Sequence, residues 1–359
     1  MNPSILVMGF STRHVAQSAH EAGYTVYAVD HFCDQDLSWY TRDRIRFDEL
    51  ADLPSAVQEM CGKYRIDWAV PTSGAETLAH GLPVLGTSPE VAARFLDKVS
   101  TQEFFESLRV PVPRLLPDGQ YPAMIKPRSG SGGWRNRVVC SREEESLWHE
   151  EFEGMESISQ EIVSGTPASV SCLADGKGNA RALAANRQIL RDEGVSAFGF
   201  CGSQTPLEHP LAPRMIAYAE KVAASSGCCG SLGVDFVIGE DIHAIEVNPR
   251  FQATLDTVER SLGLNLFSAH VRACRGELPD NVPNPSSCFS IRRILFAERD
   301  CTVSGDLSGL SPAVSDIPWP GTFFEEGQAV VSVYGWGPTP ESAMHHLDRH
   351  IRRVRQYIR

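Results

Sequence analysis

The chain has 359 residues, more than one hydrophobic core usually holds, so we expect two or three domains. Apolar residues make up 42% and charged residues 22%, which is typical of a globular protein. The formal charge of −12 argues against a nucleic-acid-binding protein, and no apolar run approaches the roughly 20 residues that span a bilayer. The N-terminus MNPSILVMGF lacks the pattern of a signal peptide and the cysteines form no C-x-x-C pair, so we expect a cytoplasmic protein with reduced thiols.

The first ninety residues alternate predicted strands and helices. Apolar runs at 5–8, 25–29 and 68–70 predict buried strands, and residues 11–22 and 53–63 have helical spacing. This order predicts a small open α/β sheet that lacks the G-x-G-x-x-G of dinucleotide-binding proteins. Ligands of such sheets bind outside the carboxyl ends of the strands, where six residues are candidate substrate contacts: Gly9, Ser11, Arg13, Asp30, Ser73 and Glu76. Each of them is also a common turn or cap residue, which is the simpler interpretation of any single one.

Further along the chain, short strands predominate, and one of them carries a lysine. Two helices are predicted over residues 89–97 and 100–108, with Lys98 between them, and a strand over 121–125 runs into Lys126. The stretch SGSGG follows, comprising Ser129, Gly130, Ser131, Gly132 and Gly133. Its backbone amides can wrap phosphate oxygens while Lys126 supplies positive charge, although a plain hairpin loop would have the same composition.

The segment GVDFVIGEDIHAIEVNPR, residues 233–250, predicts a β-hairpin with its turn at Gly239. Glu246 and Asn248 are two residues apart and therefore share one face of their strand, and pairing about the turn brings Asp235 close to that face. Two carboxylates and an amide oxygen suit Mg²⁺, and Arg250 adds a fork of donors for a phosphate or carboxylate. The alternative is a solvated strand face beside a turn.

Residues 280–287 are rich in Pro, Asn and Ser and predict a linker. Strands are predicted at 290–297 and 328–334, and a helix begins after Thr339 with apolar residues at 343, 347, 351, 354 and 358. We expect a small sheet with one helix. Arg292 and Arg293 would lie either at an active site or on the surface.

The order of these features resembles the ATP-grasp superfamily over residues 1 to about 275: an α/β domain, Lys98, the strand ending in Ile125-Lys126-Pro127, the SGSGG loop, then QEIV, GVDFV and EVNPR. The resemblance implies a mixed α/β and α+β fold in which two subdomains clamp ATP between antiparallel sheets. It implies a Rossmann-like pre-ATP-grasp domain at 1–90, the ATP-grasp domain at 91–285 and a small biotin-carboxylase-like lobe at 286–359.

The same resemblance implies roles for individual residues. Lys98 and Lys126 would contact the ATP phosphates, and the loop of residues 129–133 would close over them. The adenine would be held by Gln160, Glu161, Ile162 and Val163. Mg²⁺, or Mn²⁺ in its place, would be held by Asp235, Glu246 and Asn248, while Arg250 and Lys126 would act on the reacting groups. The residues after Val163 read SGTPAS and lack the Glu that binds the ribose in many members.

The nearer resemblance is to predicted ATP-dependent carboligases related to biotin carboxylase, through the segments GFSTRHVAQSAHEAGYTVYAVDHFCDQD, EVNPRFQATLD, RRILFAERD and DIPWPGTFFEEGQAVVSVYG. It implies an ADP-forming carboxylate–amine ligase that works through an acyl phosphate, with amino-acid or glutamate ligation in a pterin- or furan-type one-carbon cofactor as the narrower hypothesis. The expected partners are a small-molecule carboxylate and an amine, and a homodimer is the candidate assembly. Three alternatives stay open: a bicarbonate-using carboxylase, a nucleotide-binding protein or phosphotransferase, and a plain binding module for small acids.

Overall fold

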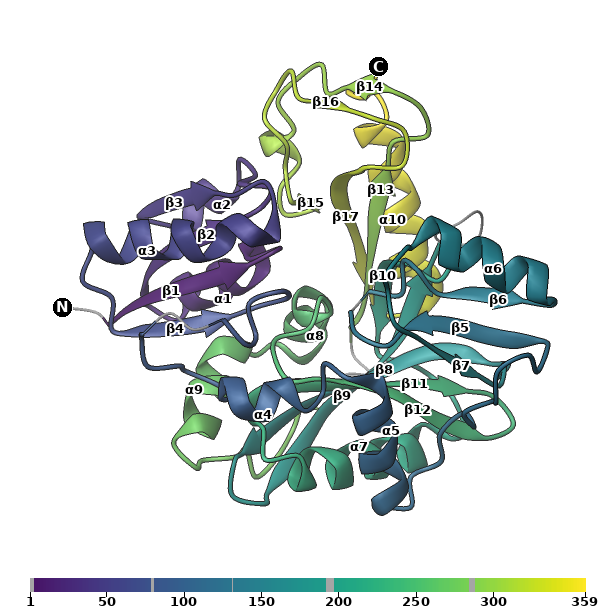
Figure 1. The fold of residues 1–359 in the computed structure, drawn as a ribbon. Helices are drawn as coiled ribbons and strands as arrows, with labels where there is room; N and C mark the ends of the chain where they lie inside the picture. The colour runs from purple at the N-terminus through teal and green to yellow at the C-terminus, as the bar shows by residue number, and fades with distance from the viewer. Residues whose placement is uncertain (1–2, 79–80, 131, 192–196, 284–287) are drawn as a thin grey trace.

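The computed structural model describes residues 3–78, 81–130, 132–191, 197–283 and 288–359. An N-terminal region, a small three-stranded sheet and a C-terminal region are arranged around a long central sheet (Figure 1). None of the described helices is long and apolar enough to cross a membrane.

The N-terminal region is the predicted open α/β sheet. Its strands are all parallel, in the order β3-β2-β1-β4, and their carboxyl ends point toward the centre of the molecule (Figure 1). The elements are β1 (Ser4–Gly9), α1 (Arg13–Glu21), β2 (Thr25–Asp30), α2 (Leu37–Tyr40), β3 (Asp43–Arg46), a 3-10 turn (Leu50–Asp52), α3 (Leu53–Lys63) and β4 (Trp68–Pro71). Strand β3 was not predicted, because it is short and only partly buried.

A small three-stranded sheet follows, in the order β6-β5-β7, with α6 packed on it. The elements of this region are α4 (Pro89–Ala93), α5 (Lys98–Ser107), β5 (Ala123–Pro127), β6 (Arg137–Val139), α6 (Arg142–Glu151) and β7 (Ser157–Gln160). The core of the small sheet is four buried residues, Ala123, Ile125, Val139 and Trp148. The sequence also predicts a strand over residues 159–163. In the structure this strand is β7, which ends at Gln160, so Glu161 to Val163 lie beyond its end.

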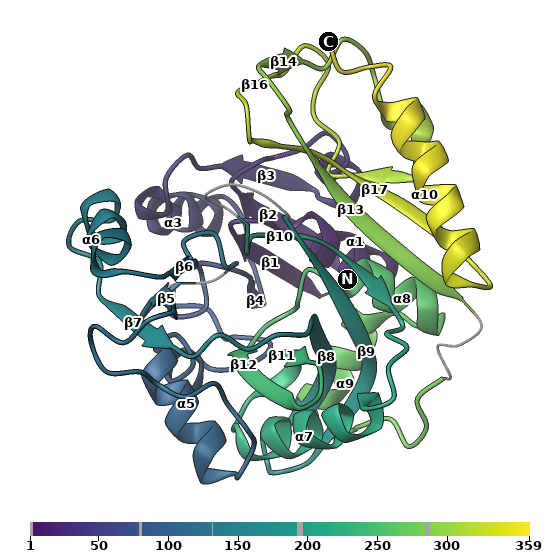
Figure 2. The same ribbon diagram turned by 90° about the vertical axis from the view of Figure 1, so that its right-hand side faces the viewer.

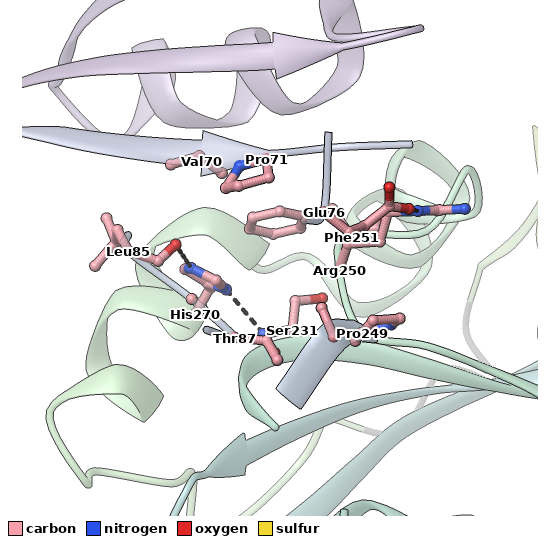
Figure 3. Close-up of a pocket in the computed structure, with 12 residues that line it drawn as sticks. Val70, Pro71, Glu76, Leu85, Thr87, Ser231, Pro249, Arg250, Phe251 and His270 are labelled. Atoms are coloured by element: carbon pink, nitrogen blue, oxygen red, sulfur yellow. Dashed lines mark hydrogen bonds and ion pairs between the residues drawn. The ribbon is translucent and has the colours of Figure 1, made fainter. Parts of the chain in front are cut away.

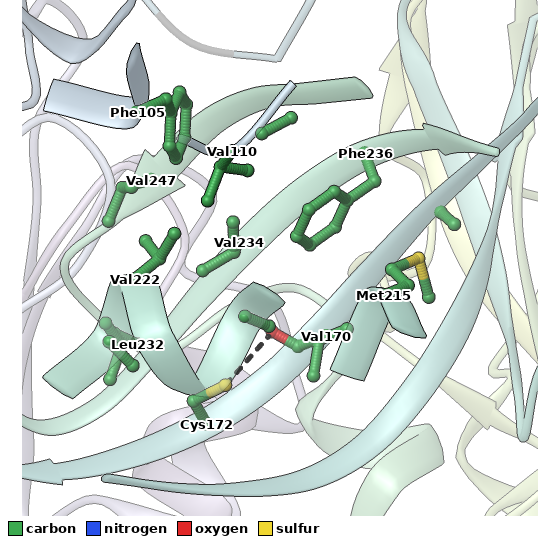
Figure 4. Close-up of a cluster of buried hydrophobic side chains, with 14 of the residues drawn as sticks. Phe105, Val110, Val170, Cys172, Met215, Val222, Leu232, Val234, Phe236 and Val247 are labelled. Carbon is green, nitrogen blue, oxygen red and sulfur yellow. Dashed lines mark hydrogen bonds between the residues drawn. The ribbon is translucent and has the colours of Figure 1, made fainter. Parts of the chain in front are cut away.

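The central sheet has eight antiparallel strands in the order β12-β11-β8-β9-β10-β13-β17-β15. They are β8 (Thr166–Asp175), β9 (Ala180–Leu190), β10 (Phe200–Thr205), β11 (Cys229–Ile238), β12 (Ile242–Asn248), β13 (Phe289–Phe296), β15 (Val314–Ser315) and β17 (Ala329–Gly337). Helix α7 (Ala212–Ser225) covers one face, where Met215 and Val222 pack with Leu232, Val234 and Phe236 of β11 (Figure 4). Helices α8 (Leu255–Leu262) and α9 (Leu266–Cys274) share a second core with α1, β1 and β2, and so join the central sheet to the N-terminal sheet.

The C-terminal strands extend the central sheet, because β13 pairs with β10. Helix α10 (Pro340–Val354) lies along β13 and β17 (Figure 2). Thr339 caps it by accepting a hydrogen bond from the Ser342 amide, and the predicted apolar stripe packs on the strands through Ala343, Leu347 and Val354. A two-stranded pair completes this region, formed by β14 (Cys301–Thr302) and β16 (Phe323–Phe324), with a 3-10 turn at Ser308–Leu310.

Candidate functional site

The hairpin β11–β12 brings together the three residues expected to bind a metal. Asp235 lies directly opposite Glu246 in the antiparallel register, and Gly233 lies opposite Asn248. The Asn248 amide nitrogen donates to both carboxylates, 3.1 Å from Asp235 Oδ2 and 3.3 Å from Glu246 Oε1. As the sequence predicts, the hairpin turns at Gly239 and brings Asp235, Glu246 and Asn248 together.

This cluster carries more negative charge than its protein partners neutralise. Burial, followed by the charge of Glu246, raises the pKa of Asp235 well above its ordinary value. A divalent cation would relieve the repulsion, and the donors are the hard oxygens that Mg²⁺ prefers. Among the described residues no three His, Cys, Asp or Glu side chains form a metal cluster, so Asn248 would complete the set by turning its amide oxygen inward.

Gln252 is a neighbour of this cluster that the sequence did not single out. Its Nε2 donates to Asp235 Oδ1 at 3.2 Å, while its Oε1 accepts from Ser171 Oγ at 3.1 Å. A side chain at Gly233 would collide with it, because a Cβ there would lie 1.7 Å from Gln252 Cδ. The glycine in GVDF is the signal that something packs closely on this strand.

Two lysines face the hairpin. Lys126, at the end of β5, is buried and donates to Gln160 Oε1 at 2.8 Å, and Lys98 at the start of α5 donates to the Gly130 carbonyl at 2.8 Å. Burial lowers the pKa of Lys126 to about 8, Glu246 opposes this shift, and the charge of Lys98 adds to it. Burial also lowers the pKa of Lys98, again against the influence of Glu246. Both lysines therefore lie within electrostatic reach of one carboxylate on the central sheet.

The position of Lys126 depends on a short chain of amides. Gln160 is in turn bound to α5, because its Nε2 donates to Gln102 Oε1 at 2.7 Å. Gln102 was not among the predicted site residues. The signal for it was its spacing of four from Lys98, which places both on one face of the helix.

The glycine loop joins β5 to β6 within the small sheet and contacts the central sheet. Gly130, Gly132 and Gly133 have positive φ angles of 125°, 81° and 72°, a backbone that few other residues adopt, while Ser131 lies outside the described residues. The carbonyl of Gly132 accepts from the Phe200 amide at 3.2 Å. Ser129, at the other end of the loop, forms an antiparallel β-bridge with Asp97, the residue before Lys98. The loop is thus placed next to the lysines, as phosphate binding requires.

The residues expected at the adenine form the connection between the two sheets. The carboxylate of Glu161 is turned toward Arg114, accepting from its backbone amide at 3.0 Å and its Nε at 2.7 Å, and Ile162 keeps 38% of its surface exposed. A cavity of about 450 Å³ opens just beyond Val163, between the start of β8 and residues 187–191, which are the end of β9 and the residue after it. That volume is within the range of small-molecule pockets.

Arg250 links this cleft to the N-terminal sheet. Its Nε pairs with Glu76 Oε1 at 2.7 Å and its NH2 donates to Asn248 Oδ1 at 3.1 Å. Glu76 also accepts from the Gly74 amide at 2.7 Å, in the loop after β4. Beside this pair lies a cavity of about 20 Å³, roughly the space of one water, with Phe251 and His270 on its wall (Figure 3).

The remaining substrate candidates occupy structural positions. Arg13 is buried and forms ion pairs with Asp256 at 2.7 Å and Asp316 at 2.9 Å, and Arg292 binds the other oxygen of Asp316 at 2.8 Å. These contacts place both arginines in a charge network where the N-terminal sheet, helix α8 and the C-terminal strands meet. Their aspartate partners on α8 and after β15 were not predicted, because they lie 243 and 303 residues from Arg13.

The other residues at the strand ends shape the loops there. Asp30 accepts four hydrogen bonds from the loops after β1 and β2. The carbonyl of Ser73 accepts from the Phe10 amide at 2.7 Å. Gly9 leaves no space for a side chain, because a Cβ would lie 2.3 Å from Thr72 Oγ1, and Ser11 is partly buried beside it.

Comparison with known proteins agrees with this architecture. A family described as "ATP-grasp domain" matches residues 95–254. The large chain of carbamoyl phosphate synthase from Rubrobacter xylanophilus is 24% identical over 91% of this chain and 36% of its own length, and that from Pseudomonas syringae is 24% identical over 74% and 27%. This chain thus spans about a third of the length of these relatives. An uncharacterized protein of Methanocaldococcus jannaschii is 24% identical over 92% of this chain and 88% of its own.

Solved structures share the fold at low sequence identity. The biotin carboxylase domain of Hydrogenobacter thermophilus 2-oxoglutarate carboxylase, solved with MgADP and bicarbonate, has a TM-score of 0.79 at 17% identity, covering 100% of this chain and 90% of that one. The phosphoribosylamine–glycine ligase of Thermotoga maritima has a TM-score of 0.73 at 16% identity, covering 99% and 97%. With the domain matched over residues 95–254, these similarities confirm the predicted mixed α/β architecture: the chain has the ATP-grasp fold.

Proposed function

We propose that this protein is an ATP-dependent carboxylate–amine ligase. ATP phosphorylates a substrate carboxylate, giving an acyl phosphate and ADP, and an amine then displaces the phosphate. One observation carries the proposal: α5, which begins with Lys98, packs against β12, which carries Glu246 and Asn248. In agreement with this contact, the charge of Glu246 acts to raise the pKa of both Lys98 and Lys126 against the effect of burial. A triphosphate between them would satisfy the lysines directly and the carboxylate pair through a divalent cation.

Each residue of the cleft has a defined part in this reaction. A bound Mg²⁺ or Mn²⁺ would be held by Asp235, Glu246 and Asn248 and would neutralise charge on the transferring phosphoryl group. Lys126, fixed by Gln160, would donate to the phosphates. No side-chain nucleophile is required, because the substrate carboxylate itself attacks and the protein contributes positioning and charge.

Arg250 is the candidate for binding the reacting carboxylate. Its guanidinium contacts both Glu76 of the N-terminal region and Asn248, one of the three residues proposed to hold the metal. A substrate carboxylate that replaced Glu76 as its partner would be held next to the phosphates. The narrower proposal, which the same site would serve, is amino-acid or glutamate ligation in making a pterin- or furan-type one-carbon cofactor.

The test is an ADP-release screen of the purified protein with Mg²⁺ and ATP over pairs of carboxylic acids and amines, amino acids included. We expect ADP release that requires one particular acid and one particular amine, with the ligated product visible by mass spectrometry. Glu246→Gln should lower this ADP release by about 10²–10³, while Glu240→Gln in the exposed turn of the same hairpin should leave it unchanged.

Other outcomes would replace the proposal. ADP release driven by bicarbonate, without an amine, would make the protein a carboxylase, a chemistry suggested by the bicarbonate in the Hydrogenobacter thermophilus structure. A stable phosphorylated product would indicate a phosphotransferase. ATP binding without ADP release under any pair would indicate a nucleotide-binding protein without catalysis.

A further inference from the structure

Three aromatic side chains gather at the carboxyl ends of β1 and β2. Phe10 directly follows β1, and His31 and Phe32 directly follow β2; we refer to these three residues as the aromatic wall. Phe10 stacks on His31, with ring centroids 4.5 Å apart and planes inclined by 12°, and Phe32 meets Phe10 edge-on at 5.3 Å. Phe10 remains 39% exposed and Phe32 38% exposed, so two neighbouring rings together form an exposed apolar surface at the ends of these strands.

A buried carboxylate holds the wall in place. Asp30 Oδ2 accepts from the amide and hydroxyl of Thr12, at 2.6 and 2.8 Å, and its Oδ1 accepts from the amides of Phe32 and Cys33, at 2.8 and 2.7 Å. One side chain therefore fixes both loops that carry the aromatic rings. The buried carboxylate of Asp30 therefore fixes the position of Phe10 and Phe32, which remain partly exposed to solvent.

His31 contributes to the wall through its ring. Its Nδ1 is inaccessible to solvent and makes no hydrogen bond to any described residue, so the imidazole is held by aromatic contacts. It stacks under Phe10 and contacts the buried Phe47, with centroids 5.8 Å apart. His31 thus contacts both the exposed Phe10 and the buried Phe47.

The wall is adjacent to the residues proposed to bind the substrate carboxylate. The Phe10 amide donates to the carbonyl of Ser73, one residue before Gly74, whose amide binds Glu76 at 2.7 Å. Glu76 in turn pairs with Arg250 at 2.7 Å. The carboxyl ends of β1 and β2 point into the centre of the molecule (Figure 1), which is where open α/β sheets bind their ligands.

We propose that the aromatic wall binds a flat aromatic ring of the substrate while Arg250 holds a carboxylate of the same molecule. The proposal rests on the ligase function and adds the chemical class of its acid: an aromatic or heteroaromatic carboxylate. A planar ring can stack on Phe10 and meet the edge of Phe32, whereas a short aliphatic acid leaves both rings in water.

The test is equilibrium binding of benzoate, measured by ligand-observed NMR with Mg²⁺ and a non-hydrolysable ATP analogue present, against cyclohexanecarboxylate and acetate. We expect benzoate to bind about three- to tenfold more tightly than cyclohexanecarboxylate, the typical contribution of one aromatic pair. Phe10→Ala and Phe32→Leu should remove that preference and leave the affinity for the nucleotide analogue unchanged.

The matched control is Phe323→Ala, because Phe323 is 57% exposed and lies on β16, away from the cleft. Its preference for benzoate should equal that of the wild type. Equal affinities for benzoate and cyclohexanecarboxylate, or a preference that survives both wall variants, would overturn the proposal. So would a change of oligomeric state in the wall variants without any change in benzoate binding, because the wall would then be an interface between copies of the chain.

Binding and turnover separate this inference from the proposed function. Benzoate binding that depends on the wall, together with no ADP release under any pair, would support the wall and remove the ligase. ADP release with aliphatic acids alone would support the ligase and remove the wall.

Discussion

Replacing Glu246 by glutamine should make the protein more stable and less active at once. Glu246 lies opposite Asp235 in the β11–β12 register, and its charge is one cause of the raised pKa of Asp235. Removing it relieves a repulsion that the metal-free protein bears. It also removes the attraction of Glu246 for Lys98 and Lys126, which offsets part of this gain. The same substitution removes one of the two charges that would hold the cation during the reaction.

The two effects differ in size. Two unit charges about 4 Å apart interact by about 4 kcal/mol at an effective dielectric constant near 20. Since Asp235 already takes up a proton more readily than usual, we expect only about 1–2 kcal/mol of this to return as stability at pH 7. For a chain of 359 residues that corresponds to a rise of roughly 1–3 °C in the unfolding midpoint without metal. Loss of a charged clamp typically lowers turnover by about 10²–10³.

Thermal unfolding with and without Mg²⁺, and ADP release on the same preparations, would measure both effects. Glu240→Gln is the control, because it makes the same charge change in the exposed turn of the same hairpin. It should change neither quantity. The reasoning would be refuted if Glu246→Gln destabilised the metal-free protein, or if its turnover stayed within about threefold of that of the wild type.

Three further substitutions test other parts of the structure. Lys126→Met should lower kcat/KM for ATP by about 10²–10³. The control is Lys63→Met, on the exposed face of α3, which should leave kcat/KM unchanged. Equal kcat/KM values in the two variants would mean that Lys126 does not bind the nucleotide. Arg13→Met leaves Asp256 without its ion-pair partner and leaves Asp316 paired with Arg292 alone, so urea unfolding should show a loss of about 3–5 kcal/mol in the free energy of unfolding. A loss below about 1 kcal/mol would mean that this network does not hold the three elements together. Burial raises the pKa of Glu259 from 4.5 to about 7, so its stabilising contribution is complete below pH 4.5 and is lost as the pH rises to about 7. Glu259→Gln keeps the hydrogen-bond acceptor and should abolish this loss of up to about 3 kcal/mol, as measured by unfolding midpoints at pH 5 and pH 8; identical pH profiles of variant and wild type would contradict the assignment.

The sequence predicted those parts of the cleft that depend on local rules. A turn at Gly239 and a strand period of two were enough to place Asp235 opposite Glu246. The end of a strand and the glycines after it were enough to place Lys126 beside a loop with positive φ angles. In each case the deciding residues lie within about ten positions of one another.

Other parts depended on distant partners that no periodicity reveals. The carboxylate of Glu161 is turned toward Arg114, 47 residues earlier, so β7 ends before the segment predicted to continue it. Arg13 was predicted as a substrate contact because it follows the carboxyl end of a strand. Its ion-pair partners are Asp256 on α8 and Asp316 after β15, which are far from it in the sequence. The C-terminal strands were predicted as strands, but their pairing with β10 follows from tertiary packing alone.

The most direct test of the account is the structure of this protein with Mg²⁺ and a non-hydrolysable ATP analogue. We predict a metal ion about 2.0–2.2 Å from oxygens of Glu246 and Asn248, with the phosphates reaching Lys126 and the adenine beside Ile162. A nucleotide bound elsewhere, or a metal ion that contacts none of the hairpin carboxylates, would contradict the account.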